Sequence, residues 1–315
     1  MPRIFGFPLA LALTLAAGRL LADGSAITAN DTLELTRDPR PAALGGAYSA
    51  LAAGPDAMNF NPAGLTDLRL TELQVSHMAY VEGINGDTVE LGMPIYGLGA
   101  WGLGGSCVYS SDQGRDNWGN STGTFGNYDT SLMVALALQW RAFSAGFTYQ
   151  ILRSDYAVQN KVEGAFALGS DFNFGLQARR LLDGRLDLGL SGQNFGTPMS
   201  LGSSIYSLPM TWSGGAAWSL MPQWKLAAEF SHQPIEFFNA WHFGTEYSID
   251  LGSSGSVALR AGYVDSAQSQ LGQGSGASAG LGLGWSAWRF DYAATSMGDF
   301  GLVHRLSLAY TFGGD

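Results

Sequence analysis

From residue 70 onward, large apolar side chains recur at every second position of the chain. The last such segment shows the pattern in full: Leu302, Leu306, Leu308, Tyr310 and Phe312 share one parity, and Val303, Arg305, Ser307, Ala309 and Thr311 share the other. A period of two places alternate side chains on opposite faces of an extended strand. The sequence therefore predicts an all-β fold for this part of the chain.

The residues of the second parity indicate which kind of β-protein this is. A soluble β-sandwich also alternates, but its outward faces are rich in Lys, Glu and Thr. Here the second face is mostly Gly, Ala and Ser with scattered charges, and only 13% of all residues are charged. A transmembrane barrel turns its apolar face to lipid and encloses the other face. We therefore expect a transmembrane antiparallel β-barrel, with a β-sandwich as the alternative.

Fourteen segments have the length of a strand, and an even number is typical of single-chain bacterial barrels. Tight turns at Gly97-Leu98, Arg141-Ala142, Asp183-Gly184 and Ser286-Ala287 alternate with longer polar connections such as 111–128 and 264–274. Short turns belong to the periplasmic rim, so both termini are expected there. The expected strands are 70–80, 87–96, 99–110, 129–140, 143–153, 162–179, 185–194, 207–218, 223–232, 238–249, 256–264, 275–285, 288–297 and 302–312.

Three tryptophans flank the predicted tight turns. Trp140 precedes one turn, and Trp285 and Trp288 enclose another. Aromatic residues form girdles at both membrane interfaces of such barrels, so we expect these side chains to lie at the periplasmic interface. Burial in a protein core is the alternative.

The N-terminus has the layout of a secretory signal. A basic start, Met1-Pro2-Arg3, precedes an apolar run and the small residue Ala22. This pattern predicts a signal peptide over residues 1–22 and export. Residues 23–69 do not alternate and are expected to form a compact hatch before a barrel at 70–315. The single Cys107 excludes an intrachain disulfide.

Composition also excludes several functions. With 26 acidic and 16 basic residues the net charge is −10, and no basic cluster occurs, so no nucleic-acid partner is expected. His242 shares a face with Glu246, which is too little for a metal site. We expect no cofactor, no metal and no catalytic residue. An outer-membrane lipid hydrolase that uses Ser and His is the enzymatic alternative, but no strained Gly-x-Ser-x-Gly turn supports it.

The hatch contains the most specific short motif of the chain. Asn61 is placed to cap a short helix that begins at Pro62, because proline lacks the N–H that the first helical turn leaves unpaired. The candidate hatch residues are Asn59, Phe60, Asn61, Pro62, Ala63, Gly64 and Leu65. In a transport barrel, Met58, Phe60 and Leu65 are expected to contact the solute or to move with the hatch.

Five charged residues share the predicted inner face, namely Glu246, Arg260, Arg289, Asp291 and Arg305. Unpaired charge is costly in a confined lumen. We expect these candidate lumen charges to neutralise one another and to brace the barrel against the hatch, with contact to a substrate as the alternative.

In its motifs the chain resembles PorV/PorQ-family outer-membrane proteins, which are related to FadL-type transporters. The resemblance extends over most of the chain beyond residue 22, in the order and spacing of short segments. These are 44–48, 56–57, 59–65, 146–150, 189–196, 259–263, 298–301 and 304–308.

The resemblance implies a barrel of 14 strands in the outer membrane of a diderm bacterium, with the hatch folded into its lumen. FadL-type proteins pass hydrophobic molecules through such a barrel as the hatch moves. PorV receives cargo for type IX secretion, which leaves a secretion or surface-attachment subunit that binds cargo through its outer loops as the alternative. The expected partners are outer-membrane lipids, the barrel-assembly machinery, which would recognise Tyr310 and Phe312, and either a hydrophobic small molecule or a secreted protein.

Overall fold

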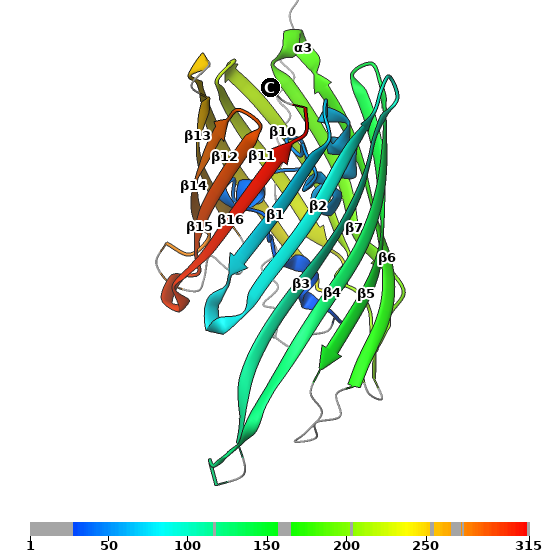
Figure 1. Cartoon of the computed structure of the whole chain (residues 1–315), viewed down its shortest axis with the longest axis vertical. Coiled ribbons are helices and arrows are strands. Elements are labelled where there is room, and N and C mark those ends of the chain that lie inside the picture. Colours follow the sequence, from blue (N-terminus) through cyan, green and yellow to red (C-terminus); the bar gives the residue numbers. More distant parts are fainter. Residues whose placement is uncertain are drawn as a thin grey trace, which may run out of the picture.

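A single closed barrel of fourteen antiparallel strands dominates the structure (Figure 1). The computed structural model describes residues 28–115, 118–156, 165–201, 204–252, 255–265, 272 and 274–313. Strand β1 (Glu72–Ala79) pairs with β2 on one side and with the last strand, β16 (Leu302–Thr311), on the other. This closure leaves no free sheet edge and confirms the predicted fold class.

The remaining barrel strands follow one another around the barrel in chain order. They are β2 (Asn85–Ile95), β3 (Gly99–Arg115), β4 (Ser121–Trp140), β5 (Phe143–Tyr156), β6 (Ala165–Arg180), β7 (Leu186–Gly196), β10 (Thr211–Met221), β11 (Trp224–Gln233), β12 (Phe238–Asp250), β13 (Ser256–Asp265), β14 (Ala277–Trp285) and β15 (Trp288–Ser296).

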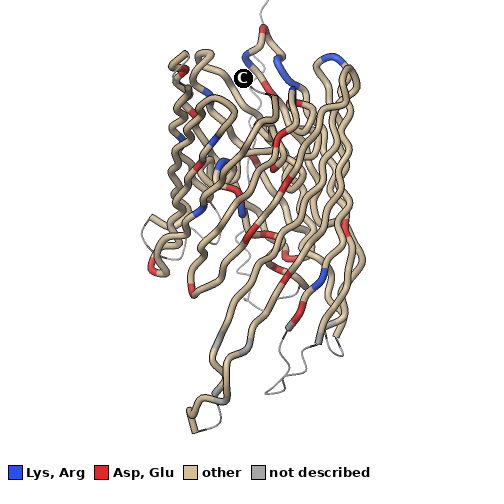
Figure 2. Tube along the Cα trace, viewed as in Figure 1, with Lys and Arg blue, Asp and Glu red and all other residues tan. Residues whose placement is uncertain are grey.

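Alternation of side chains along each strand produces the two faces of the barrel. In β4, Leu132 and Leu136 are exposed on the outside, whereas Met133, Ala135 and Ala137 are buried on the inside. Charged residues are few along the strands and gather near strand ends and around the hatch (Figure 2). Because the large apolar side chains point outward and not into a core between two sheets, the β-sandwich alternative is wrong.

All of the predicted tight turns lie at the same end of the barrel. In the turns after β4 and β14, Arg141 and Ser286 adopt the left-handed conformation, with φ of 56° and 51°. This conformation matches the twist of two strands joined by a two-residue turn. Trp140, Trp285 and Trp288 are exposed beside these turns, so the alternative of a core position for them is wrong.

The expected polar loop at 111–128 is largely strand. β3 continues to Arg115 and β4 begins at Ser121, and Ser110 pairs with Asn127 across them. The resulting hairpin extends beyond its neighbours at the end of the barrel opposite the tight turns (Figure 1). The alternation of apolar residues did not reveal this extension, because the strands pair through backbone groups and most residues of the segment are polar.

A second difference concerns the strand expected at 207–218. The barrel strand starts only at Thr211, and Ser207 instead pairs with Thr28 of the N-terminal segment. Before it, β8 (Met199–Leu201) and β9 (Ser204–Tyr206) form a separate hairpin. Met199 of this hairpin is fully buried in a cluster with Leu152 and Ala167 of the barrel wall. The connection after β7 therefore folds back over the inner wall.

The hatch lies inside the barrel, where it appears in blue in Figure 1. It consists of short elements joined by turns: the 3₁₀ helices η1 (Asp31–Glu34) and η2 (Pro62–Asp67) and the α-helices α1 (Pro39–Ala43) and α2 (Ala57–Phe60). Three further single turns, η3 (Val81–Gly83), α3 (Leu181–Gly184) and η6 (Gly298–Phe300), belong to connections between strands. No helix of the described residues has the length and apolar character needed to cross a membrane. The predicted signal peptide, residues 1–22, and hatch residues 23–27 lie outside the described residues.

Glycines on the inner wall allow the hatch to approach the strands. A Cβ atom on Gly146 would overlap Pro62, one on Gly175 would overlap the Asn61 side chain, and one on Gly189 would overlap the backbone of Ser49. Only glycine avoids these overlaps, because it has no side chain. The glycines of the second parity therefore provide space for the hatch.

Gly189→Val tests this close fit. The new side chain must displace the hatch turn at Ser49, and overpacking of this kind costs about 1–3 kcal/mol. We expect a lower melting temperature and faster hydrogen exchange in the hatch. Gly214→Val is the matched control, because a Cβ there faces outward and meets only Leu190 Cδ1 at 3.8 Å. Equal stability of the two variants would contradict the proposed role of Gly189.

Candidate functional site

Side chains of the barrel wall bind the backbone of the hatch. The Glu229 carboxylate accepts hydrogen bonds from the backbone N–H groups of Tyr48 and Ser49, at 3.0 and 2.7 Å. The Gln177 amide donates to the carbonyl oxygens of Ser49 and Ala52, at 2.9 and 3.1 Å. A hatch with little regular structure leaves buried backbone groups unpaired, and each of them needs a partner. The wall supplies these partners.

Asn61 is the central residue of the predicted hatch motif. Its side-chain oxygen accepts from the Ala63 backbone N–H at 3.2 Å and caps η2, which confirms the predicted helix start. Its amide nitrogen donates to the carbonyl oxygens of Ser49 and Leu176, at 2.8 and 3.1 Å. Asn61 therefore joins two turns of the hatch to each other and to β6.

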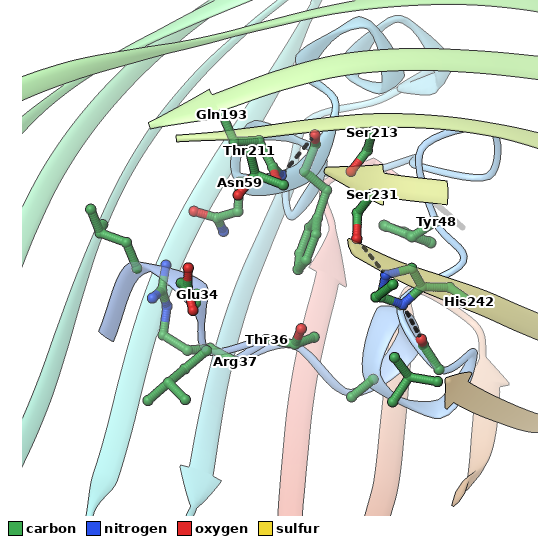
Figure 3. Close-up of a pocket in the computed structure, with 18 of the residues that line it drawn as sticks. Glu34, Thr36, Arg37, Tyr48, Asn59, Gln193, Thr211, Ser213, Ser231 and His242 are labelled. Carbon is green, nitrogen blue, oxygen red and sulfur yellow. Dashed lines mark hydrogen bonds between the residues drawn. The ribbon is translucent and has the colours of Figure 1, made fainter. Parts of the chain in front are cut away.

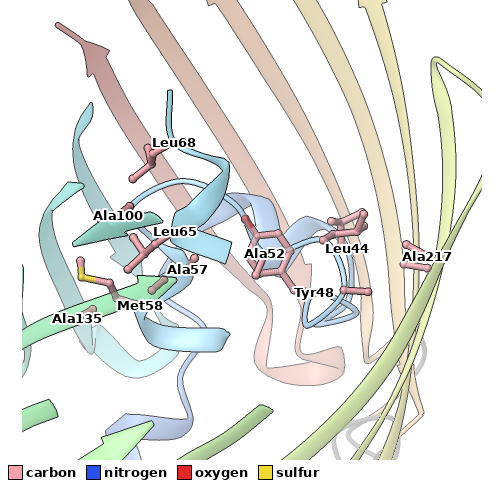
Figure 4. Close-up of a cluster of buried hydrophobic side chains, with 14 of the residues drawn as sticks. Leu44, Tyr48, Ala52, Ala57, Met58, Leu65, Leu68, Ala100, Ala135 and Ala217 are labelled. Atoms are coloured by element: carbon pink, nitrogen blue, oxygen red, sulfur yellow. The ribbon is translucent and has the colours of Figure 1, made fainter. Parts of the chain in front are cut away.

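The other motif residues pack between the hatch and the wall or face the lumen. Pro62, Ala63, Gly64 and Leu65 are buried. Leu65 and Met58 belong to an apolar cluster that contains hatch residues and small residues of the wall (Figure 4). This cluster comprises Leu44, Ala47, Tyr48, Ala50, Leu51, Ala52, Ala57, Met58, Leu65 and Leu68 of the hatch and Ala100, Met133, Ala135, Ala137, Ala217 and Ala227 of the strands.

Four of the five candidate lumen charges form one chain of ion pairs. Glu246 binds Arg260 at 2.6 Å, Arg260 binds Asp291 at 2.6 Å, and Asp291 binds Arg289 at 3.1 Å. Glu72 of β1 extends the chain at one end, 2.8 Å from Arg289.

The hatch supplies the charge at the other end. The Arg40 guanidinium of α1 donates two hydrogen bonds to the Glu246 carboxylate, at 3.0 and 3.1 Å. With Arg40, three arginines alternate with three carboxylates, so the chain is neutral. Such a paired network avoids the cost of isolated buried charge and fixes α1 against the wall.

Arg305, the fifth candidate lumen charge, lies apart from this chain. Its guanidinium donates to the Thr36 carbonyl of the hatch and, at 3.0 Å, to the Thr295 hydroxyl. Arg305 therefore also contacts the hatch, but at a cavity and not within the ion-pair chain.

A cavity of about 590 Å³ lies between the hatch and the inner wall (Figure 3). This volume falls within the range of small-molecule binding sites. Its lining is mixed. Apolar side chains include Leu33, Leu35, Phe60, Phe238 and Met297, and polar ones include Asn59, Gln150, Gln193, Ser213 and Ser231. Phe60 is the predicted solute contact that lines the cavity, whereas Met58 and Leu65 do not line it.

Carboxylates outnumber basic groups around this cavity. Its lining holds Asp31, Glu34, Asp38, Glu229 and Glu236, against Arg37, Arg305 and His242. Enclosure in the lumen, together with the nearby carboxylates of Glu236 and Asp31, raises the pKa of Glu34 to about 8. Burial likewise raises the pKa of Asp38. Burial is the first cause of both shifts, so both carboxyl groups favour the protonated form more than they would in water.

His242 fixes another turn of the hatch. Its ring nitrogens lie 2.8 Å from the Gly45 carbonyl oxygen and 2.9 Å from the Ser231 hydroxyl (Figure 3). His242 does not contact Glu246 in any hydrogen bond or ion pair of the described residues. Within the part of the chain that the structure describes, no three His, Cys, Asp or Glu side chains gather as metal ligands would.

The polar lining of the cavity was missed at the level of the sequence. Arg37 and Asp38 lie in a non-alternating segment, and Gln150 and Gln193 are single polar residues within strands. The sequence did indicate that Gln150 and Gln193 occupy inward-facing positions of their strands. It does not reveal that the two side chains face one cavity.

Comparison with known proteins relates this arrangement to solved barrels. No family profile and no curated protein matches the sequence. The toluene transporters TodX of Pseudomonas putida and TbuX of Ralstonia pickettii both align with a TM-score of 0.59, over 87% of this chain and 98% of theirs, at 11% and 12% identity. A FadL homologue of Pseudomonas aeruginosa aligns with a TM-score of 0.57 at 12% identity, with the same coverage. The fold is therefore that of the FadL-like hydrocarbon-transporter barrels.

Arg40→Met tests the link between the hatch and the ion-pair chain. Removing Arg40 leaves Glu246 with one partner, and we expect the free energy of hatch opening to fall by roughly 2–4 kcal/mol. Hydrogen exchange of residues 39–60 measures this opening in the reconstituted protein. Arg153→Met is the control, because Arg153 pairs with Asp155 on the exposed surface. An Arg40→Met hatch as protected as the wild type would refute the link.

Asp56 predicts a dependence of hatch stability on pH. Burial, and then the charge of Asp38, raises the pKa of Asp56 to about 7 from its ordinary value of 3.8. Because the folded state holds this proton more tightly, stability is greatest at low pH and declines until the pH passes about 7. The groups that face Asp56 are the Tyr48 hydroxyl, at 3.1 Å, and the charges of Asp38, Arg40 and Arg289.

Between about pH 5 and about pH 8 we expect hatch opening to become easier by roughly 1–3 kcal/mol. Asp56→Asn mimics the protonated carboxyl group and should remove the part of this dependence that Asp56 contributes, whereas Glu34, whose pKa is raised to about 8, contributes the rest. Hydrogen exchange of the hatch at both pH values, corrected for the intrinsic exchange rate, is the measurement. A slope that is identical in the wild type and in Asp56→Asn would show that another group titrates.

Proposed function

We propose that this protein is an outer-membrane channel of a diderm bacterium that admits hydrophobic or amphipathic solutes. The observation that carries the proposal is the cavity of about 590 Å³ enclosed between the hatch and the barrel wall. A solute that entered the barrel would reach this cavity first and would pass further only when the hatch moved.

The arrangement of hatch and cavity along the barrel supports this route. The hatch touches the wall at Gly146 and Gly189, a few residues from the tight turns. Gln233 and Phe238, which line the cavity, stand at the other end of their strands. The cavity therefore lies toward the end with the long β3–β4 hairpin. If the tight turns face the periplasm, the cavity opens toward the outside and the hatch guards the periplasmic side.

The outer surface supports a membrane location. Its exposed side chains include many leucines, phenylalanines and tryptophans, and an apolar face of this extent requires lipid or another apolar partner. The solved barrels of the same fold are described as transporters and channels, which supports a role without catalysis.

We also propose, more specifically, that the protein belongs to the PorV/PorQ family. This proposal rests on the short segments of hatch and barrel that resemble that family in sequence. It brings with it the second candidate function, a secretion or surface-attachment subunit. The observation that favours this candidate is the β3–β4 hairpin, which projects beyond the other strands (Figure 1). A protein partner would find an extended polar surface there.

Uptake into whole cells tests the transport function. A diderm host without its own hydrophobic-solute channels would express the protein and receive four labelled compounds with the same phenylbutyl body: butylbenzene, 4-phenylbutan-1-ol, 4-phenylbutan-1-amine and 4-phenylbutanoate. We expect faster uptake of at least one compound than in cells without the protein. Ser213→Phe fills the cavity and should reduce this uptake on the order of tenfold.

Gly214→Phe is the matched control for this variant. Gly214 is the next residue of β10 and points outward. Cells with Gly214→Phe should therefore take up the compounds as fast as cells with the wild-type protein. If none of the four compounds enters faster, the transport proposal fails. In that case the secretion alternative predicts that replacing residues 111–128 by a short turn abolishes the surface display of an exported protein.

A further inference from the structure

Several buried polar side chains of the cavity lining have an atom without a hydrogen-bond partner among the described residues. Within the part of the chain that the structure describes, five buried side-chain atoms of residues that line the cavity make no hydrogen bond, namely Arg37 Nε, Asp38 Oδ2, Ser49 Oγ, Asn59 Oδ1 and Gln150 Oε1. Arg37, Asp38, Ser49 and Gln150 are each at least 94% buried. Buried polar groups are nearly always paired in folded proteins, and an unpaired one is costly. Several such atoms around one cavity indicate a ligand that pairs with them.

The chemical type of these atoms defines the ligand. Asn59 Oδ1 and Gln150 Oε1 only accept hydrogen bonds, and Asp38 Oδ2 does so when its carboxyl group is ionised. The Ser49 hydroxyl both donates and accepts, and Arg37 Nε only donates. A ligand that satisfies the set must therefore donate more hydrogen bonds than it accepts. A hydrocarbon satisfies none of these atoms. A carboxylate offers only acceptors.

The charge around the cavity leads to the same choice. Its lining contains five carboxyl groups and only three basic side chains. Burial, and then the carboxylates of Glu236 and Asp31, raise the pKa of Glu34, so this part of the lining disfavours negative charge. A second negative charge in this enclosed space would be repelled, whereas a positive or neutral group would not. The charge balance therefore disfavours an anionic solute.

The apolar part of the lining defines the rest of the ligand. Phe60 of the hatch packs edge to face on Tyr48, with ring centres 5.5 Å apart, and both rings line the cavity. Leu33, Leu35 and Phe238 add further apolar surface. An alkyl or aromatic body fits against these side chains while its polar end meets the acceptors.

We propose that the cavity selects amphiphiles whose polar end is a hydrogen-bond donor without negative charge, that is, alcohols and amines with an alkyl or aromatic body. This inference rests on the proposed transport function and specifies its substrate class. It separates this chain from the solved barrels of the same fold that are described as toluene transporters and monoaromatic hydrocarbon channels.

Binding of the four phenylbutyl compounds to the protein in lipid nanodiscs tests the proposal. The compounds share one body and differ only in the end group: none, hydroxyl, ammonium or carboxylate. Calorimetric titration gives each Kd, and nanodiscs that contain the cavity-filled Ser213→Phe variant correct for partition into lipid. We expect the amine and the alcohol to bind on the order of tenfold more tightly than butylbenzene and 4-phenylbutanoate.

Gln150→Met identifies the atoms responsible. It removes one unpaired acceptor at nearly constant side-chain volume. We therefore expect the amine and the alcohol to bind several-fold more weakly, and butylbenzene to bind as tightly as before or more tightly. Ser49→Ala, a smaller change at a second unpaired atom, gives an independent measurement if Gln150→Met folds poorly. Gln139→Met is the matched control, because Gln139 lies at the tight-turn end of β4, away from this cavity.

The outcomes separate the two proposals. If butylbenzene or 4-phenylbutanoate binds as tightly as the amine and the alcohol, the inference about the polar end is wrong, while transport of a hydrophobic solute stands. The inference is also wrong if neither Gln150→Met nor Ser49→Ala changes the order of the four affinities. If no compound binds in the nanodiscs or enters the cells, the proposed function fails as well.

Discussion

The structure depends on one constraint. The hatch has little regular secondary structure, so the barrel wall must supply hydrogen-bond partners for its buried backbone N–H and C=O groups. Glu229, Gln177 and Thr148 meet this requirement with hydrogen bonds of 2.7 to 3.1 Å to hatch backbone atoms. These partners are side chains, so they fix the hatch at particular points and do not make it part of the sheet. A hatch held in this way has a defined position and a finite number of contacts to break when it moves.

Ion pairs attach the hatch to the wall in addition to these hydrogen bonds. Arg40 joins the hatch to a neutral chain of ion pairs that reaches from Glu246 to Glu72. Breaking such a chain at one end leaves a charge without its full set of partners, which is costly in an enclosed space. The barrel charges also pair with one another, so most pairs of the wall network do not involve Arg40.

The pairing of polar groups is incomplete around the cavity. Around the apolar cluster of Leu44, Met58 and Leu65, hatch and wall are closely packed. Around the cavity, buried polar atoms such as Asp38 Oδ2 and Gln150 Oε1 have no hydrogen-bond partner in the described ranges of the chain. One side of the hatch thus serves attachment, and the other presents groups that a solute would complete.

The sequence by itself determined the barrel, because a period of two fixes which side chains face outward, and the small residues of the other parity exclude a packed sandwich. It also determined the tight turns and the Asn61 cap, which depend on neighbouring residues only. It did not reveal the polar extension of β3 and β4, because strands that pair through backbone hydrogen bonds can do so without alternating apolar side chains. Tertiary structure alone decided that Arg40 meets Glu246 and that Arg37, Ser49 and Gln150 surround one cavity. Arg37, Arg40 and Ser49 of the hatch are far from Gln150 and Glu246 in the chain, and closure of the barrel around the hatch sets the distances between them.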